Sequence, residues 1–383
     1  MEPFQEIYTK ILREEITPAS GCTEPISIAF CAAKAHQVLG MQPTAATVSV
    51  SEEILKNAKS VVVPNTNGLK GICAAVAAGI VCGDAEKGVH AIDALSEEQR
   101  TAIVRFMELV NIDVSCAETD CPLYISVTLY ARTSYTRVVI ANGHSNIVEI
   151  MKNGEPLLKR PIAVQSDDSA PDRSCLNPHD ILVFAENADL SGVRDLLDLQ
   201  IEYNSAVSAE GLRNDYGMNI GKLLLKEHPS DPKTTAKAYA AAGCDARMSG
   251  CDLPVAGLCG SASKGIAASV PVICFAKHHG IDKDRLYRAL ILSDLLAVYQ
   301  RYGSKQTPSS CGVIGAGCAA GAGIAYLLGG DESAILSTYE NAIDAAPCIV
   351  CDGAKPSCAA KVAAAVEVGM LGYQMYLSHQ CSL

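Results

Sequence analysis

The feature that most constrains the fold is a change of sequence pattern near residue 190. Beyond it the strand signals stop, and apolar residues recur at helical spacing between Gly, Pro and Asp breaks. This pattern predicts helices at about 191–227, 233–249, 264–279, 283–302, 308–328, 332–345 and 357–378. We therefore predict that residues 191–383 form an all-helical domain.

The first part of the chain mixes helical and strand patterns. Helical patterns at about 2–15, 25–39, 68–82 and 97–110 surround a β-rich run, TAATVSVSEE. Residues 124–160 then alternate apolar and polar side chains, which is typical of an antiparallel meander with one solvated face. We predict an α+β domain with a mainly antiparallel sheet over 1–155, followed by a Pro-rich linker or crossing loop over 156–190.

Cysteine usage indicates a reducing compartment. The 17 cysteines are diluted in a chain of 383 residues, which is long enough to bury a full core without disulfides. The opening segment, MEPFQEIYTKILREEI, has the pattern of an acidic amphipathic helix rather than of a secretory signal. We therefore expect a reduced, cytoplasmic protein.

Charge and hydropathy argue against two classes of partner. The formal net charge is -11, and no cluster of Lys and Arg suggests a nucleic-acid footprint. Residues 311–330 are apolar, but mostly through Gly and Ala, and they lack aromatic and basic flanks. We predict a buried helix there, with no nucleic acid and no membrane as partner; a homodimer is one of the assemblies that we allow.

Three cysteines stand where helices are expected to begin. In TPSSC, Thr307 and Pro308 provide a helix start that places Cys311 in the first turn, and KPSC does the same for Cys358. Backbone N–H groups at a helix N-terminus stabilise thiolates. Cys351 lies in the turn before the second helix, which gives the spacing C-x39-C-x6-C. Three thiolate ligands suit an iron-sulfur cluster with one open iron, whereas a closed zinc site needs a fourth ligand.

A fourth cysteine has the features of a base or nucleophile. In ITPASGCTEP, Cys22 follows a Gly turn, and Thr23 and Glu24 begin a helix, a setting that lowers a thiol pKa. Further loops offer hydroxyls, amides and charged groups of the kind that holds the carboxylate and amino group of an amino acid. The candidate substrate-binding residues are Glu24, Asn65, Thr66, His144, Ser145, Asn146, Asp245, Arg247, Ser261 and Lys264.

Two other motifs are set aside. CIVC at 348–351 has redox spacing, but no βαβ pattern precedes it. GAGCAAG at 315–321 places its third Gly one residue too late for a dinucleotide fingerprint and follows no strand.

The motifs SGCTEP, GHSNIV, DARMSG and CDGAKPSC together resemble the L-cysteine desulfidase family, which is related to the iron-sulfur-dependent L-serine dehydratases. The resemblance extends over nearly the whole chain. It implies a 4Fe-4S cluster on Cys311, Cys351 and Cys358, with Cys22 as the catalytic base. The implied reaction is β-elimination of L-cysteine to pyruvate, ammonia and sulfide without pyridoxal phosphate.

One loop departs from the family pattern. Where the family usually has a GSGNQG-like loop, this chain has GSASKG at 260–265, so that Ser263 and Lys264 replace two amides. A substrate with a second anionic group or an unusual leaving group is therefore conceivable. L-Serine is the alternative substrate, and a non-catalytic iron-sulfur sensor and a zinc hydrolase are the alternative classes. Cys381 is a further thiol that could cap the open iron.

Overall fold

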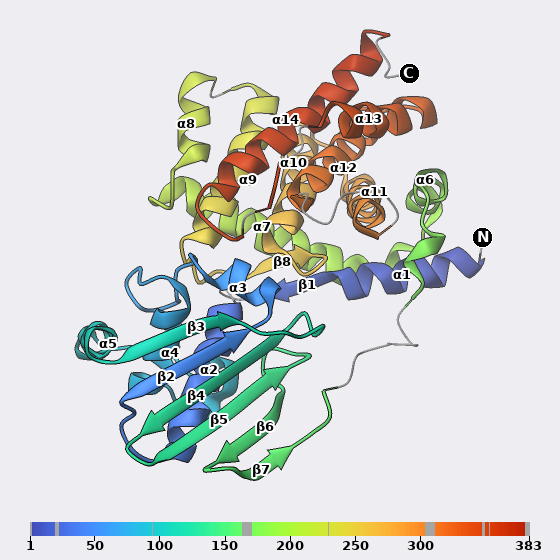
Figure 1. Ribbon diagram of the computed structural model, residues 1–383. Coiled ribbons are helices and arrows are strands. Elements are labelled where there is room, and N and C mark those ends of the chain that lie inside the picture. The colour runs from blue at the N-terminus through green and yellow to red at the C-terminus, as the bar shows by residue number, and fades with distance from the viewer. Residues whose placement is uncertain are drawn as a thin grey trace.

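A layered sheet region and a helical region make up the described part of the chain (Figure 1). The structure, a computed structural model, describes residues 2–19, 23–93, 95–162, 171–228, 230–302, 311–346, 349–351 and 353–379. Thr307, Pro308 and the thiols Cys22, Cys348 and Cys381 lie outside these ranges.

The sheet has six strands in the order β3-β2-β4-β5-β6-β7. Strands β2 and β3 pair in parallel, and the other neighbours pair antiparallel, so the prediction of a mainly antiparallel meander is confirmed. The strands are β2 (Ala45–Val50), β3 (Asn111–Cys116), β4 (Tyr124–Ala131), β5 (Ser134–Ala141), β6 (Ile147–Lys152) and β7 (Glu155–Lys159).

Helices cover one face of this sheet (Figure 1). Alternate residues of β4, among them Ile125, Val127 and Leu129, share a buried apolar cluster with residues of α2 and α4. This two-residue period is what turns one face of a strand toward a core. The helices of this region are α2 (Thr23–Leu39), α3 (Glu52–Ala58), α4 (Gly71–Cys82), the short 3-10 helix η1 (Ala85–His90) and α5 (Glu97–Leu109).

The helical region forms a second core, which includes residues from the start of the chain. Helix α1 (Glu2–Glu15) contributes Tyr8, Ile11 and Leu12 to it. Strand β1 (Ile16–Ala19) pairs antiparallel with β8 (Val255–Leu258). The remaining elements are η2 (Arg173–Cys175), α6 (Pro178–Asn187), η3 (Leu190–Gly192), α7 (Arg194–Arg213), α8 (Ile220–Glu227), α9 (Pro232–Met248), α10 (Ala262–His279), α11 (Lys283–Tyr302), α12 (Gly312–Leu327), α13 (Glu332–Ala345) and α14 (Cys358–Leu377).

The structure differs from the sequence prediction at several elements. The predicted all-helical half contains the four-residue strand β8, and the predicted linker at 156–190 contains the end of β7 and the whole of α6. The helix predicted over 191–227 is interrupted between α7 and α8, where Gly217 and Asn219 have positive φ. The division into domains at residues 155 and 190 stays a prediction, and α1 and β1 pack with the helical core rather than with the sheet.

Helices α12 and α14 cross in backbone contact. A Cβ atom on Gly321 would collide with the carbonyl oxygen of Gly369, and a Cβ atom on Gly369 would collide with that of Gly317. Only residues without side chains permit such an approach. The helix expected within 311–330 is therefore buried, as its Gly and Ala content predicted. Among the described residues, no helix is long and apolar enough to cross a membrane.

One carboxyl group is fully buried in the helical core. Asp294 on α11 is 0% exposed, and its Oδ1 accepts a hydrogen bond from Gln200 Nε2 at 3.1 Å. Burial raises the pKa of Asp294 to about 7, and the hydrogen bond from Gln200 lowers it only in part. Asp294 Oδ2 and Gln200 Oε1 are buried without hydrogen-bond partners in the described structure. A proton on Asp294 would supply a donor in this acceptor-rich place.

We expect this group to make the protein less stable as the pH rises. An unfolded Asp loses its proton near pH 3.9, whereas folded Asp294 keeps it until about pH 7. Between these values the native state binds more protons, so the free energy of unfolding falls as pH increases through this window. Asp294→Asn should remove this contribution to the pH dependence of the free energy of unfolding. The contribution is on the order of 1.4 kcal/mol per pH unit between about pH 4 and 7, or a few kcal/mol in total. Denaturant unfolding at several pH values measures it. An unchanged slope would show that Asp294 is ionised when folded.

Candidate functional site

The thiol of Cys311 meets that of Cys351 at the beginning of α12. Cys311 is the N-cap residue of this helix, so its predicted place within the first turn was wrong. Its backbone N–H donates to Ile349 O at 2.8 Å, which ties α12 to the loop that carries Cys351. The hydrogen bond with Cys351 is the main cause that raises the pKa of the Cys311 thiol, and burial raises it further. Two neighbouring thiols cannot both ionise easily unless a cation joins them.

Cys358 is the first residue of α14, with Pro356 in the turn before it. Its Sγ lies 3.7 Å from Gly353 O. Gly353 has φ +97°, and a Cβ atom there would collide with the carbonyl oxygen of Lys56 in α3. The loop between Cys351 and Cys358 thus rests against the sheet region, where Figure 1 shows the start of α14 facing α3.

The three predicted cluster ligands are brought together only in part. Within the described ranges, no three His, Cys, Asp or Glu side chains stand at metal-ligand spacing. Cys311 and Cys351 are in contact, and the loop that carries Cys351 leads into α14, whose first residue is Cys358. This donor set fits a soft metal centre, because thiols beside helix N-termini are the ligands that iron-sulfur clusters use. The assignment of all three ligands stays a prediction.

A buried cation lies within electrostatic range of Cys244, a thiol on which Cys358 also acts. Arg247 on α9 is 4% exposed, and neither its Nε nor its Nη1 has a hydrogen-bond partner among the described residues. Leaving buried charged donors unsatisfied costs several kcal/mol. A planar guanidinium with two unpartnered nitrogens is a common partner of a carboxylate. Arg247 is therefore the predicted substrate residue that the structure supports most directly.

Sequence reasoning missed two residues beside Arg247. The Sγ of Cys244 lies 3.4 Å from Oγ of Ser263, which joins α9 to α10. Burial raises the pKa of Cys244, and Cys358 acts on it in the same direction, whereas Arg247 lowers it. Cys244 thus lies within electrostatic range of both Arg247 and Cys358. The sequence contains a signal for both residues, because Cys244 directly precedes the DARMSG motif and Ser263 lies in the altered GSASKG loop.

Asp245 has a structural role. Its Oδ1 accepts from Met218 N at 3.0 Å and its Oδ2 accepts from Ile220 N at 2.8 Å. The carboxylate therefore caps the beginning of α8, where Asn219 has φ +52° and its side chain makes no capping bond. Its predicted place among the substrate ligands is not supported by these contacts.

Lys264 reaches the beginning of α12. Ser261 is the N-cap of α10, with its Oγ accepting from Lys264 N at 3.5 Å. The Lys264 side chain covers Gly312, next to Cys311, and its Nζ donates to Cys259 O at 3.4 Å. Burial lowers the pKa of Lys264, and Cys311 is among the groups that act on it. The altered loop therefore lies beside a predicted cluster ligand.

The predicted residues of the sheet region are divided between three places. Glu24 is in the first turn of α2 and accepts from Asn57 Nδ2 of α3 at 3.3 Å. His144 is half-buried in the turn between β5 and β6, and Ser145 and Asn146 are exposed there. Asn146 Nδ2 donates to Ala141 O at 2.8 Å, which closes the turn. No described contact joins this turn to the thiols of the helical region.

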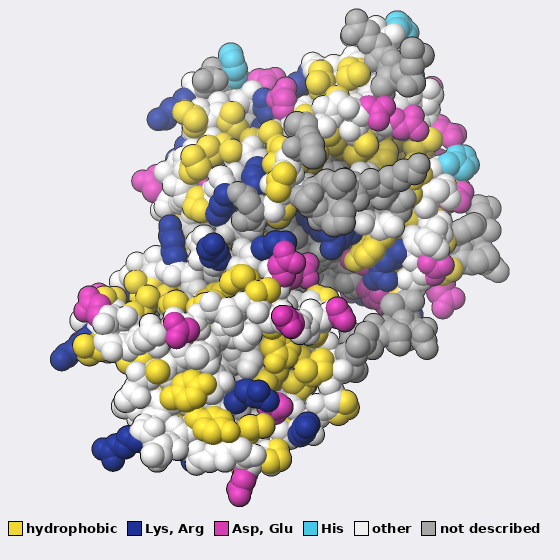
Figure 2. Space-filling model, viewed as in Figure 1, with side chains coloured by type: hydrophobic (Ala, Val, Ile, Leu, Met, Phe, Trp, Pro, Cys, Tyr) yellow, Lys and Arg dark blue, Asp and Glu magenta, His cyan; other side chains and the backbone are white. Residues whose placement is uncertain are grey.

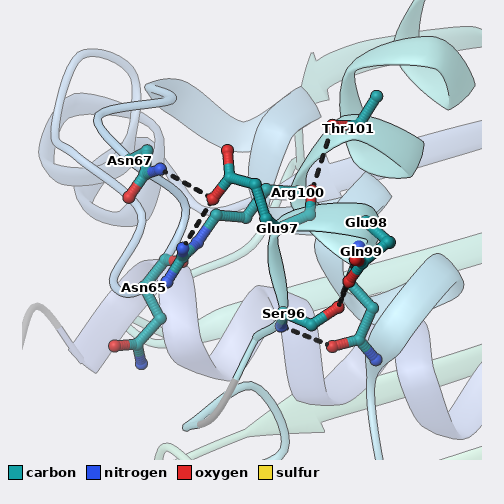
Figure 3. Close-up of polar contacts among 8 residues, drawn as sticks. All are labelled: Asn65, Asn67, Ser96, Glu97, Glu98, Gln99, Arg100 and Thr101. Atoms are coloured by element: carbon teal, nitrogen blue, oxygen red, sulfur yellow. Dashed lines mark hydrogen bonds and ion pairs between the residues drawn. The ribbon is translucent and has the colours of Figure 1, made fainter.

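Asn65 and Thr66 belong to a loop of the sheet region, and Figure 3 shows the polar contacts that hold it at Asn65 and Asn67. Arg100 Nε donates to Asn65 O at 2.9 Å, and Arg100 also binds Glu97, which accepts from Asn67. Thr66 is buried and donates to Val63 O at 2.7 Å. Ser96 begins α5 with a capping box that keeps this anchor in place. The contacts seen here give both residues a structural role.

Comparison with known proteins assigns the family. The sequence model of the serine dehydratase alpha chain matches residues 46–382. The chain belongs to this family. The UPF0597 protein of Desulfitobacterium hafniense is 46% identical over 377 residues, which is 98% of this chain and 88% of the relative. That of Lachnoclostridium phytofermentans is 42% identical, over 96% of this chain and 88% of the relative. The UPF0597 protein of Treponema denticola is 37% identical, over 97% of this chain and 87% of the relative.

Membership in the serine dehydratase family defines the class of chemistry. The family is that of iron-sulfur-dependent serine dehydratases, so the chain is a lyase of the serine dehydratase type. The matched range includes Cys311, Cys351 and Cys358. The names of the UPF0597 relatives state no activity, and cysteine as substrate stays a prediction.

Arg247 provides a test that does not depend on the identity of the amino acid. Arg247→Lys keeps the charge but removes the forked donors, so we expect KM to rise about 10- to 100-fold, while the iron content stays unchanged. Arg285→Lys is a matched control, because Arg285 Nε is also buried without a partner in the described structure, but its Nη2 donates to Tyr326 O. Steady-state kinetics on both variants measure the effect. Equal changes in the two variants would show that Arg247 is structural.

Proposed function

We propose that this member of the serine dehydratase family is an iron-sulfur lyase that eliminates sulfide from L-cysteine. The observation that carries the proposal is the buried Arg247 guanidinium, in which two nitrogens have no hydrogen-bond partner among the described residues and which lies within electrostatic range of Cys244. Cys358 acts on the same thiol, which brings the cation near the predicted cluster ligands. Such a cation suits the carboxylate of a small amino acid held near thiol-bound iron.

Each part of the site has a task in this proposal. Cys311, Cys351 and Cys358 hold a 4Fe-4S cluster, which when bound supplies a Lewis acid with one open iron. Arg247 holds the substrate carboxylate and so fixes the orientation of Cα and Cβ. Enclosure of Arg247 and Ser263 keeps water away from the bound carboxylate.

Elimination also needs a base for a weakly acidic α-proton, and we assign this task to Cys22, because a thiol near a helix N-terminus ionises readily. The α-proton passes to the Cys22 thiolate while the Cβ–S bond breaks and hydrosulfide departs. The resulting aminoacrylate tautomerises and reacts with water to give pyruvate and ammonium. No oxidant or reductant is consumed. The oxygen sensitivity of such clusters and the use of thiolates suit a reducing cytoplasm.

L-Serine is the second candidate substrate, because the matching family is that of serine dehydratases. The two substrates differ only in the departing atom, so product analysis separates them. Pyruvate accompanied by sulfide indicates L-cysteine, and pyruvate without sulfide indicates L-serine.

The decisive experiment uses full-length protein purified without oxygen. Iron and acid-labile sulfide are counted, the visible spectrum is recorded, and L-cysteine, D-cysteine and L-serine are supplied without pyridoxal phosphate. We expect about four irons per chain, and kcat/KM highest for L-cysteine. A colourless protein that contains zinc would overturn the cofactor. An iron-sulfur protein that releases no pyruvate from any of the three would indicate a sensor.

A further inference from the structure

The ammonium group of Lys264 lies at the N-terminal ends of two helices, α10 and α12, which already carry a partial positive charge. Lys264 is the third residue of α10, and its side chain covers Gly312 at the beginning of α12. Helix N-termini carry a partial positive charge and favour anions, so a lysine at this position is electrostatically unfavourable unless an anion approaches it. The only hydrogen bond seen for Nζ within the described ranges is a 3.4 Å contact with Cys259 O.

The surroundings of Lys264 do not neutralise it. The charged and titratable groups that act on it are Cys259, Arg301, Glu15 and Cys311. Glu15, the carboxylate among them, is already held by Arg173 through a 2.5 Å bond from Nε to Oε1. Arg301 adds a second cation from α11. On the face in Figure 2, Lys and Arg side chains gather in the band between the sheet and helical regions. The positive charges around Lys264 therefore outnumber the negative ones.

The second observation is the position of Arg247 relative to Lys264. Lys264 directly follows Ser263, and Ser263 meets Cys244, which lies within electrostatic range of Arg247. The buried Arg247 and the half-buried Lys264 are thus linked in the fold through the Cys244–Ser263 contact. For Lys264 to meet the β-substituent of a small amino acid, the carboxylate of that amino acid would be bound at Arg247.

We propose that Lys264 is a specificity-determining residue that receives the departing group of the substrate as an anion and so favours sulfur over oxygen. This inference rests on the proposed lyase function. Thiols ionise near pH 8.5 and water near about 15.7, so sulfur leaves as an anion without a proton, whereas oxygen needs one. A charge-assisted hydrogen bond from Nζ to the sulfur anion stabilises its departure. No proton is transferred in this step.

The first test compares substrates. Lys264→Gln keeps a polar, slightly shorter side chain but removes its charge, and we expect the ratio of kcat/KM for L-cysteine over L-serine to fall at least tenfold. Lys264→Arg should keep the ratio within about threefold of the wild type. Lys361→Gln is the matched control, because Lys361 also acts on Cys311 but from α14, where its Nζ donates to Val350 O at 3.2 Å, and it should leave the ratio unchanged.

The second test measures binding without turnover, so that it remains valid if the lyase proposal fails. The probes are 3-mercaptopropionate and 3-hydroxypropionate, which differ only in sulfur and oxygen and lack the amino group. Calorimetry should show a preference for the thiol that drops at least tenfold in Lys264→Gln and in Lys264→Met. Iron content and circular dichroism establish that each variant is folded and loaded.

The outcomes separate the two ideas. If the wild type releases no pyruvate from either amino acid but the binding preference depends on Lys264, the lyase proposal is wrong and the role of Lys264 stands. If the folded Lys264→Gln variant keeps both ratios, Lys264 does not set specificity. A selective loss of L-serine turnover would show that Lys264 acts as a proton donor to oxygen, which also contradicts the proposal.

Discussion

Replacing Cys311, Cys351 or Cys358 by serine is expected to remove the iron-sulfur cluster and to reduce turnover more than about 10²-fold. Even residues that only support a metal ligand cost 10- to 100-fold when lost, so a direct ligand should cost more. Cys311 and Cys351 are already in contact, and loss of either thiol leaves a hydroxyl that binds iron poorly. Iron content and the brown absorption of anaerobically purified variants measure the result.

Cys318→Ala is the control for these substitutions. Cys318 lies on the same helix as Cys311 and is fully buried, so its loss perturbs packing but not the predicted ligand set. It should retain iron, with a lower melting temperature. If all three ligand variants keep wild-type iron, the cluster is held elsewhere and the assignment must be abandoned.

Replacing Cys22 by serine is expected to leave the cluster intact and to lower kcat about 10²-fold or more. A serine hydroxyl is nearly isosteric with a thiol but stays protonated at neutral pH, so it cannot accept the α-proton, and a positioned base usually contributes 10² to 10⁴. Visible spectroscopy and single-turnover kinetics separate the loss of base from the loss of cluster.

Cys31→Ser is the matched comparison for Cys22. Cys31 lies on α2, the helix that follows Cys22 in the chain, but its thiol is buried against Val138 O at 3.3 Å. It should change stability and not kcat. Near-normal turnover in cluster-replete Cys22→Ser would assign the base to another group, and loss of iron would place Cys22 among the ligands.

The helices of the C-terminal half were predictable because each buries a stripe of its own residues. The predicted ranges 283–302 and 332–345 agree with α11 and α13. Strand β8 was not predictable, because four residues show no period and the strand exists through its pairing with β1, more than two hundred residues earlier. The break between α7 and α8 depends likewise on Asp245, which caps α8 from another helix.

The candidate site was predictable in its chemistry and less so in its contacts. Cap residues and spacing indicated Cys311, Cys351 and Cys358, and the structure brings the first two together. Asp245 and Arg247 looked equivalent in the sequence, yet residues two apart on a helix point about 200° away from each other. The Asp245 side chain therefore caps α8, whereas Arg247 lies within electrostatic range of the Cys244 thiol. Only tertiary packing decides which is which.

The crossing of α12 and α14 has a consequence for how metal is acquired. Helix α12, which Cys311 caps, and helix α14, which begins at Cys358, touch through Gly317, Gly321 and Gly369, with no side chain between their backbones. No rotamer change can adjust such a contact, so the separation of the two helix starts is set before any iron arrives. The apoprotein thus meets the entropy cost of ordering these ligands during folding. Insertion of the proposed cluster would then require little further ordering of these two helix starts.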